Sequence, residues 1–162
     1  MLWFIIGILC VLIDRLSKMY VANNFAQGQS IPVINNVFNI TYHRNNGAAF
    51  SMLRGKTSFL TVTTIIIIIA ALVYIIVKRP KHNLLLMSLT LILSGAVGNL
   101  IDRIRDGAVV DFLDFKLINF PVFNVADCAI VIGGILLFIY VLKFSESGNI
   151  KDDGKKDIQS GE

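Results

Sequence analysis

The stretch that decides the fold is TSFLTVTTIIIIIAALVYIIV, residues 57–77, which contains five consecutive isoleucines and no charged side chain. An α-helix rises about 1.5 Å per residue, so roughly 20 apolar residues cross the hydrocarbon core of a bilayer. This run therefore predicts a transmembrane helix. Similar runs occur at about residues 84–104 and 123–142, and a fourth, at about residues 1–21, is interrupted by Asp14, Arg15 and Lys18.

The composition of the whole chain agrees with a membrane protein. Of its 162 residues, 55% are hydrophobic and 16% are charged, whereas a soluble domain has about 25% charged residues. Its mean hydropathy is +0.70, which excludes a cytosolic domain, a disordered chain and a fibrous protein. We expect one four-helix transmembrane domain at residues 1–144 and a disordered cytoplasmic tail at residues 145–162.

The net charge of +4 reflects membrane topology rather than a nucleic-acid partner, which we do not expect. The loop at residues 78–82, KRPKH, places three cations between two predicted spans. The positive-inside rule assigns this loop to the cytoplasm. With four spans, both termini are then cytoplasmic, and residues 22–56 and 105–122 form the outer segments.

Both outer segments contain stretches typical of β-strands. Residues 38–43 alternate apolar and polar side chains, and residues 108–115 are rich in valine and phenylalanine. A sheet on the outer surface satisfies backbone groups that lipid cannot. The predicted fold is an all-α membrane protein with four transmembrane helices, a small extracytoplasmic β-sheet or cradle, and a short outer-surface helix or loop.

The acidic residues before the tail are all aspartates, and the proposed topology gathers those inside the membrane near the outer face. An ionisable side chain in a span costs at least about 2.5–3.5 kcal/mol, so several at one depth indicate a functional site. Asp14 and Lys18, at positions i and i+4, are expected to form a structural ion pair. Asp102 and Arg103 could form an interfacial anchor. The six aspartates are Asp14, Asp102, Asp106, Asp111, Asp114 and Asp127.

Asp111 and Asp127 have apolar neighbours and no adjacent cation. Two carboxylates in a medium of low dielectric constant tend to share one proton, which is the arrangement of an aspartic protease. Asp114 is an alternative partner for Asp127, but in an extended segment it points to the face opposite Asp111.

The sequence predicts neither a metal site nor a cofactor. Cys10 and Cys128 lie in apolar stretches, and His43 and His82 stand alone. A cysteine nucleophile at Cys128 is conceivable, but no histidine lies near it in the sequence.

Five blocks of sequence resemble lipoprotein signal peptidase, or signal peptidase II, a family of bacterial aspartic peptidases. The resemblance covers nearly the whole chain before the tail. The blocks are DRLSK at residues 14–18, NNGAAFS at 45–51, GNLIDR at 98–103, VVDF at 109–112 and FNVAD at 123–127.

The resemblance implies an intramembrane aspartic endopeptidase of the bacterial cytoplasmic membrane, with its active site near the outer leaflet. Its substrates would be diacylglyceryl-modified prolipoproteins, cleaved on the amino side of the lipid-modified lipobox cysteine. It also implies contact with membrane lipids and inhibition by the peptide antibiotic globomycin. We expect a monomer.

The family pattern assigns the catalytic dyad to Asp111 and Asp127, with Asp14 and Lys18 as structural support. We expect the Asn124 amide to orient Asp127, and Arg103 to support the dyad without lying close enough to keep both carboxylates ionised. Small residues from Gly47 onward leave room for substrate backbone. The residues expected to bind substrate or inhibitor, or to order the site, are Asn45, Gly47, Asn99, Arg103 and Asn124.

A contrasting hypothesis is a non-enzymatic four-span protein that conducts ions or protons, or binds lipid. Such a protein predicts flux across liposomes and function that survives loss of one carboxylate.

Overall fold

The structure is a computed structural model that describes residues 2–47, 55–118 and 120–144. The predicted tail, at residues 145–162, and the small residues after Gly47 lie outside this description. The elements are α1 (Leu2–Asn24), β1 (Ser30–Ile34), β2 (Phe38–Asn45), α2 (Thr57–Lys78), α3 (Asn83–Asp106), β3 (Val109–Phe115), the 3-10 helix η2 (Lys116–Ile118) and α4 (Val125–Phe144).

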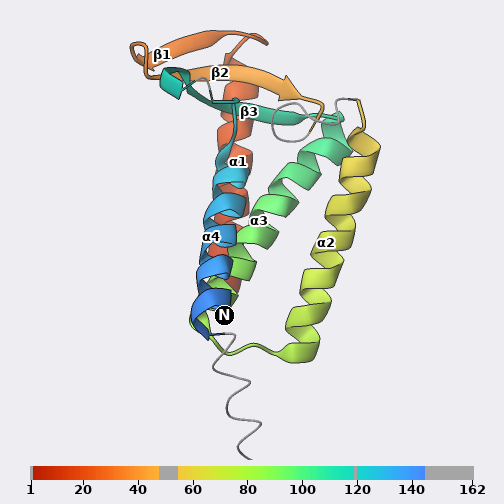
Figure 1. The fold of residues 1–162 in the computed structure, drawn as a ribbon. Helices are drawn as coiled ribbons and strands as arrows, with labels where there is room; N and C mark the ends of the chain where they lie inside the picture. The colour runs from red at the N-terminus through yellow and green to blue at the C-terminus, as the bar shows by residue number, and fades with distance from the viewer. Residues whose placement is uncertain (1, 48–54, 119, 145–162) are drawn as a thin grey trace, which may run out of the picture.

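The four long helices alternate in direction, and the sheet lies across one end of the bundle (Figure 1). Helix α3 packs against each of the other three, whereas α2 stands at the margin and buries no residue. The start of α1 and the end of α4 lie at the end far from the sheet (Figure 1).

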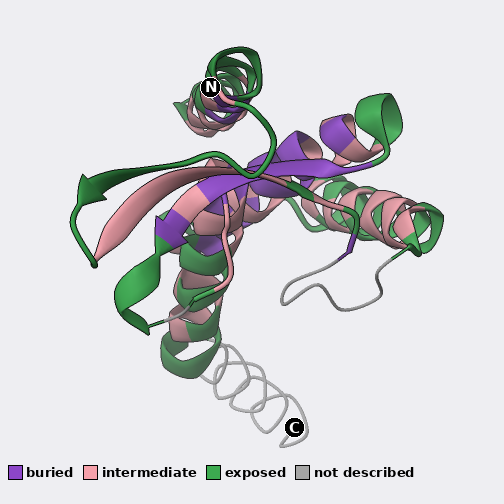
Figure 2. Cartoon of the chain, turned by 90° about the horizontal axis from the view of Figure 1, so that it is seen from above, coloured by how far each residue is buried: buried purple, intermediate pink, exposed green. Residues whose placement is uncertain are grey.

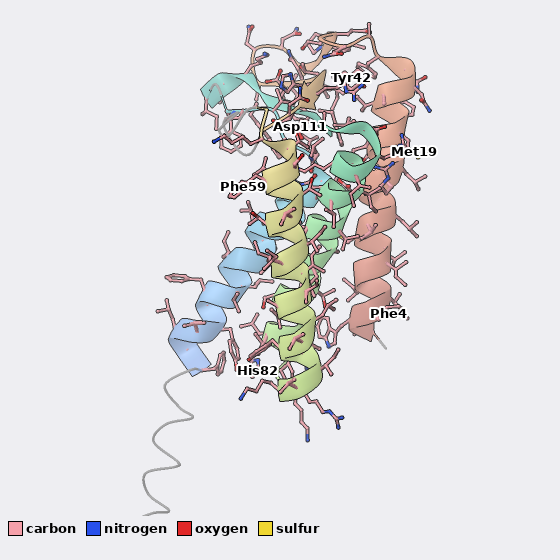
Figure 3. All side chains as sticks on the ribbon, turned by 90° about the vertical axis from the view of Figure 1, so that its right-hand side faces the viewer. Phe4, Met19, Tyr42, Phe59, His82 and Asp111 are labelled. Carbon is pink, nitrogen blue, oxygen red and sulfur yellow. The ribbon has the colours of Figure 1, made fainter. Side chains whose placement is uncertain are left out.

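Three described helices, α2, α3 and α4, are long and apolar enough to cross a membrane. Large apolar side chains point outward along the bundle, including Phe4 and Phe59 (Figure 3). Helix α1 has 23 residues but carries Asp14, Arg15 and Lys18. Three of the four predicted spans therefore correspond to helices that are long and apolar enough to cross a membrane. The span assigned to α1 stays a prediction.

The sheet has three antiparallel strands in the order β1-β2-β3. Strands β2 and β3 coincide with the segments predicted to be extended, whereas β1 was not anticipated. The side chains of β1 are exposed and those of β3 are largely buried (Figure 2). In the β2–β3 register, His43 is opposite Asp111 and Asn45 is opposite Val109.

Close packing of α3 on α4 depends on glycine. A Cβ atom added to Gly95 would lie 2.3 Å from the Ala126 carbonyl oxygen, and one added to Gly98 would lie 2.5 Å from Asp14 Oδ2. Neither position has room for a side chain without movement of its neighbours. These glycines let the polar ends of α1, α3 and α4 meet beneath the sheet.

Candidate active site

Beneath the sheet, the ends of three helices and one strand bring together polar side chains that are at most 5% exposed. Figure 3 shows Asp111 where the sheet meets the helices. Burial of this many polar groups is tolerated only when hydrogen bonds or opposite charges satisfy them. The buried polar residues of this region are Asp14, Lys18, Asn99, Asp102, Asp111, Asp114 and Asn124.

Two asparagines hold the Asp111 carboxylate, one at each oxygen. Asn124 Nδ2 donates to Asp111 Oδ1 at 2.7 Å, and Asn45 Nδ2 donates to Oδ2 at 2.9 Å. Asn45 is itself oriented, because its Oδ1 accepts the Gly47 backbone N–H at 2.9 Å. The carboxylate of β3 is thereby held by groups on β2 and at the start of α4.

The Asp127 carboxylate is held at both oxygens as well. Asn99 Nδ2 donates to Oδ1 at 2.8 Å, and the Asn124 backbone N–H donates to Oδ2 at 3.1 Å. In return, Asn124 Oδ1 accepts the Asp127 backbone N–H at 2.9 Å. This reciprocal pair is a capping box at the first turn of α4.

The capping box corrects two expectations. The helix begins at Val125 rather than at residue 123, because Asn124 caps it. The side-chain N–H groups of Asn124 bond Asp111, Asn99 Oδ1 and the Val110 carbonyl oxygen rather than the Asp127 carboxylate. The side-chain oxygen of Asn124 accepts the Asp127 backbone N–H. Asn124 therefore connects the two predicted catalytic carboxylates.

Burial raises the pKa of Asp111 to about 7, and the negative charge of Asp127 adds to the rise. The hydrogen bonds from Asn45 and Asn124 stabilise the ionised form and act in the opposite direction. Asp111 therefore keeps a proton at pH values where an ordinary aspartic acid is ionised.

A cavity of about 630 Å³ adjoins both carboxylates. Arg103 lies on its wall, with Nη2 3.5 Å from the Gly47 carbonyl oxygen, and no ion pair joins it to either carboxylate among the described residues. Arg103 therefore lies beside the dyad on the cavity wall, and its supporting role stays a prediction. The lining residues include His43, Asn45, Gly47, Asn99, Arg103, Asp111, Phe123, Asp127, Cys128 and Val131.

A second polar cluster, formed by Asp14, Arg15, Lys18 and Asp102, adjoins Asn99; all but Arg15 are buried. Lys18 Nζ is 2.9 Å from Asp14 Oδ2 and 2.9 Å from Asp102 Oδ2. Arg15 also pairs with Asp102. Asp14 Oδ1 accepts the Ala126 backbone N–H at 2.9 Å, which ties α1 to the start of α4. We call these four residues the charged cluster.

The charged cluster confirms the Asp14–Lys18 pair and corrects the interpretation of Asp102. Asp102 is only 1% exposed and pairs with two cations of α1, so it does not form an interfacial anchor with Arg103. Asn99 joins the charged cluster to the dyad, because its Oδ1 accepts from Lys18 Nζ at 2.9 Å while its amide bonds Asp127.

Asp114 is bound elsewhere, as expected for a residue on the other face of β3. It accepts from Thr41 Oγ1 at 2.6 Å and pairs with Lys116 Nζ at 2.9 Å. Its contacts join β2, β3 and the 3-10 helix η2. Asp114 does not line the cavity.

Sequence reasoning missed His43 as a cavity residue. The alternation of β2 places it on the same face as Asn45, and this signal would have found it. Cys128 shares the cavity with His43, although the two lie far apart in sequence. The lack of a histidine near Cys128 in the sequence is therefore no argument against a cysteine nucleophile. The activity of a Cys128→Ser variant is the test of that alternative.

Comparisons with known proteins agree with a membrane enzyme of this architecture. The family model for signal peptidase (SPase) II matches residues 6–143. A lipoprotein signal peptidase of Clostridioides difficile is 43% identical over 144 residues, which covers 89% of this chain and 97% of that protein. A lipoprotein signal peptidase of Staphylococcus aureus is 44% identical over 151 residues and 91% of each protein.

Solved structures described as bacterial membrane enzymes share the fold. One has a TM-score of 0.84 at 39% identity and covers 90% of each chain. Another has a TM-score of 0.80 at 40% identity and covers 88% of this chain and 93% of the other. The chain is therefore a membrane-embedded peptidase. It belongs to the signal peptidase II family.

Proposed function

We propose that this protein is an aspartic endopeptidase that removes the signal peptide from diacylglyceryl-modified prolipoproteins, cutting on the amino side of the lipid-modified cysteine. The observation that carries the proposal is the pair formed by Asp111 and Asp127. Both carboxylates line one cavity, and three asparagine side chains and a helix start hold them.

In the proposed reaction, Asp127 is ionised and Asp111 carries the shared proton. Asp127 lies in the first turn of α4, where backbone N–H groups and the helix dipole stabilise negative charge. It takes a proton from water while the water oxygen adds to the scissile carbonyl carbon. Asp111 donates its proton to the carbonyl oxygen. The proton taken by Asp127 then passes to the leaving nitrogen as the C–N bond breaks, and a hydroxyl of the intermediate returns a proton to Asp111, which restores the starting state of the dyad.

The cavity suits a lipidated peptide because it combines this polar end with an apolar wall. Val131 and Ile132 line it and are 60% and 50% exposed on the outside of the bundle. The cavity therefore extends to a surface that we expect to face lipid, which gives a substrate anchored in the membrane a lateral route to the dyad. The peptide antibiotic globomycin would compete for the same space.

We propose that α1 is the fourth span of a transmembrane domain at residues 1–144. Asp14 and Lys18 are buried and paired inside the bundle, so α1 exposes apolar side chains such as Phe4, Ile13 and Leu16. The cationic loop after α2 then places both termini in the cytoplasm and the dyad near the outer leaflet of the bacterial cytoplasmic membrane. We expect a monomer, because the polar groups of the dyad all come from one chain.

The test is cleavage of a lipidated prolipoprotein by the purified full-length protein. We expect Asp111→Asn and Asp127→Asn each to lose at least about a thousandfold in kcat, because neither proton transfer can then occur. Cys128→Ser, from the same cavity, is the matched control and should retain activity. Cleavage by either Asn variant would contradict the assignment. Flux across liposomes without cleavage would favour the ion-conducting alternative.

A further inference from the structure

The β2–β3 ladder presents its two faces to two different cavities. Because side chains alternate along a strand, residues two apart share a face. One face carries His43 and Asn45 of β2 with Val109 and Asp111 of β3, and all four line the cavity of the dyad. The opposite face carries Tyr42, Arg44 and Val110, which line a separate cavity of about 120 Å³.

His43 lies directly across the ladder from Asp111. Side chains directly opposite one another in antiparallel strands lie on the same face, with Cβ atoms about 4.5–5.5 Å apart. The register of β2 shifts between Ile40 and His43. An irregularity of this kind re-aims the side chains beside it, and here it brings His43 into register with Asp111.

The His43 imidazole has hydrogen-bonding groups that no described residue uses. Other polar side chains of this cavity wall each bond a neighbour, namely those of Asn45, Asn99, Arg103, Asp111 and Asp127. Across residues 2–47, 55–118 and 120–144, no hydrogen bond, ion pair or ring contact involves the His43 side chain. An imidazole offers one N–H donor and one acceptor nitrogen, and both are available to a ligand in the cavity.

We propose that His43 is a substrate-binding residue that donates its ring N–H to a carbonyl oxygen of the substrate. This inference rests on the function proposed above. A lipidated prolipoprotein brings two kinds of carbonyl to the cavity, those of the peptide backbone and those of the ester-linked acyl chains. A bond from His43 to either holds the substrate beside Asp111, so His43 contributes to affinity rather than to the chemical step.

The experiment is steady-state cleavage of a diacylglyceryl-modified prolipoprotein by the full-length protein and its His43→Phe and His43→Gln variants. We expect His43→Phe, which fills the space without a donor, to raise KM about three- to tenfold with kcat within about twofold. His43→Gln keeps an N–H donor and should recover most of the affinity. His82→Phe is the matched control, because His82 packs on Tyr140 and Phe144 away from the cavity.

A substrate with ether-linked alkyl chains identifies the carbonyl. If His43 binds an ester, wild type should already show the raised KM on the ether substrate, and His43→Phe should add nothing. If His43 binds the peptide, the variant should raise KM equally on both substrates.

An unchanged KM for His43→Phe on both substrates, with wild type active, overturns the inference and leaves the proposed function intact. An equal loss of Tm and kcat in both variants shows a structural role and also overturns it. Failure of wild type to cleave contradicts the proposed function itself.

Discussion

Two pairs of carboxylates meet beneath the sheet, and their partners differ in charge. Asp14, Asp102 and Asp111 are buried, and Asp127 is half-buried. Asp14 and Asp102 pair with Lys18 and Arg15. Asp111 and Asp127 accept hydrogen bonds from uncharged amide groups. Formal charges in the charged cluster cancel, whereas in the dyad two acidic groups lie together without a paired cation among the described residues.

This difference separates a structural role from a chemical one. A buried carboxylate with a cation beside it forms an ion pair that can join one helix to another, as Asp102 joins α3 to α1. Uncharged amide donors fix the position of a buried carboxylate, but they supply no positive charge to keep it ionised. Such a carboxylate can therefore exist with or without its proton. The pKa of Asp111, raised to about 7 by burial and by Asp127, shows this effect. The same residue type thus performs two tasks according to the charge of its partners.

Removing the central cation should break the charged cluster and produce the largest effect on stability. Lys18→Met leaves buried Asp14 without its cation and buried Asp102 with Arg15 alone. Removing one partner of a buried ion pair costs about 3–5 kcal/mol of the free energy of unfolding. Denaturant titration in detergent would measure the loss. Lys56→Met, at an exposed position before α2, is the control, and an equal stability of the two variants would refute the structural role of Lys18.

Asn99 joins the charged cluster to the dyad, and removing its side-chain amide should impair activity more than folding. Asn99→Leu removes the amide that bonds Asp127 and the oxygen that bonds Lys18. A hydrogen bond to a charged group contributes about 1.5–3 kcal/mol, so kcat should fall about 10- to 100-fold. Ser94→Ala on the same helix removes a hydroxyl that, among the described residues, bonds only the α3 backbone, and it should leave kcat unchanged. Full activity in Asn99→Leu would show that the dyad does not need this contact.

The dyad should respond to pH in the range where Asp111 titrates. Because the pKa of Asp111 is about 7, kcat should decrease above pH 7 and fall about tenfold per pH unit well above it, as the shared proton is lost. A pH–rate profile measures this limb. The other charged or titratable groups of the described residues that line the cavity are Asp127 and Cys128 of α4, Arg103 of α3 and His43 of β2. The limb should therefore persist in His43→Gln and in Cys128→Ser. A flat profile to pH 9 would contradict a protonated Asp111.

The raised pKa of Asp111 also predicts how stability changes with pH. An aspartic acid in an unfolded chain loses its proton near pH 4, whereas folded Asp111 keeps it to about 7. The folded state then binds more protons in this interval, so stability decreases as pH rises through it. Asp111→Asn should lack this decrease and exceed wild type in Tm at pH 8. Parallel curves for the two proteins would contradict the raised pKa.

The smallest effect on activity is expected at Asp114, the alternative member of the dyad. Asp114→Asn weakens contacts with Thr41 and Lys116 but changes nothing that lines the cavity. We expect kcat/KM within about threefold of wild type, measured on the lipidated prolipoprotein, with some loss of Tm. If Asp114→Asn were as inactive as Asp111→Asn, the assignment of the catalytic role to the Asp111 face of β3 would be wrong.

Local patterns in the sequence predicted what depends on neighbouring residues. The long apolar runs became helices, and the i, i+4 pair of Asp14 and Lys18 formed. The alternation in residues 38–43 became β2. Strand β1 was not predicted, because its residues show no matching alternation and its pairing depends on β2. The Asn124 amide was misassigned because helix spacing does not describe a residue that caps a helix rather than continuing it.

By itself, the sequence determined the membrane class, the long helices and the two aspartates in apolar settings, since hydropathy and spacing are properties of neighbouring residues. The tertiary structure decided which partner each carboxylate received. Asp102 meets Arg15 across 87 positions, and Asp14 meets Ala126 across 112. Such contacts arise only when glycines let α3 approach α1 and α4. The charge of the partner, and with it the division between the structural cluster and the proposed dyad, is therefore a property of the packed bundle.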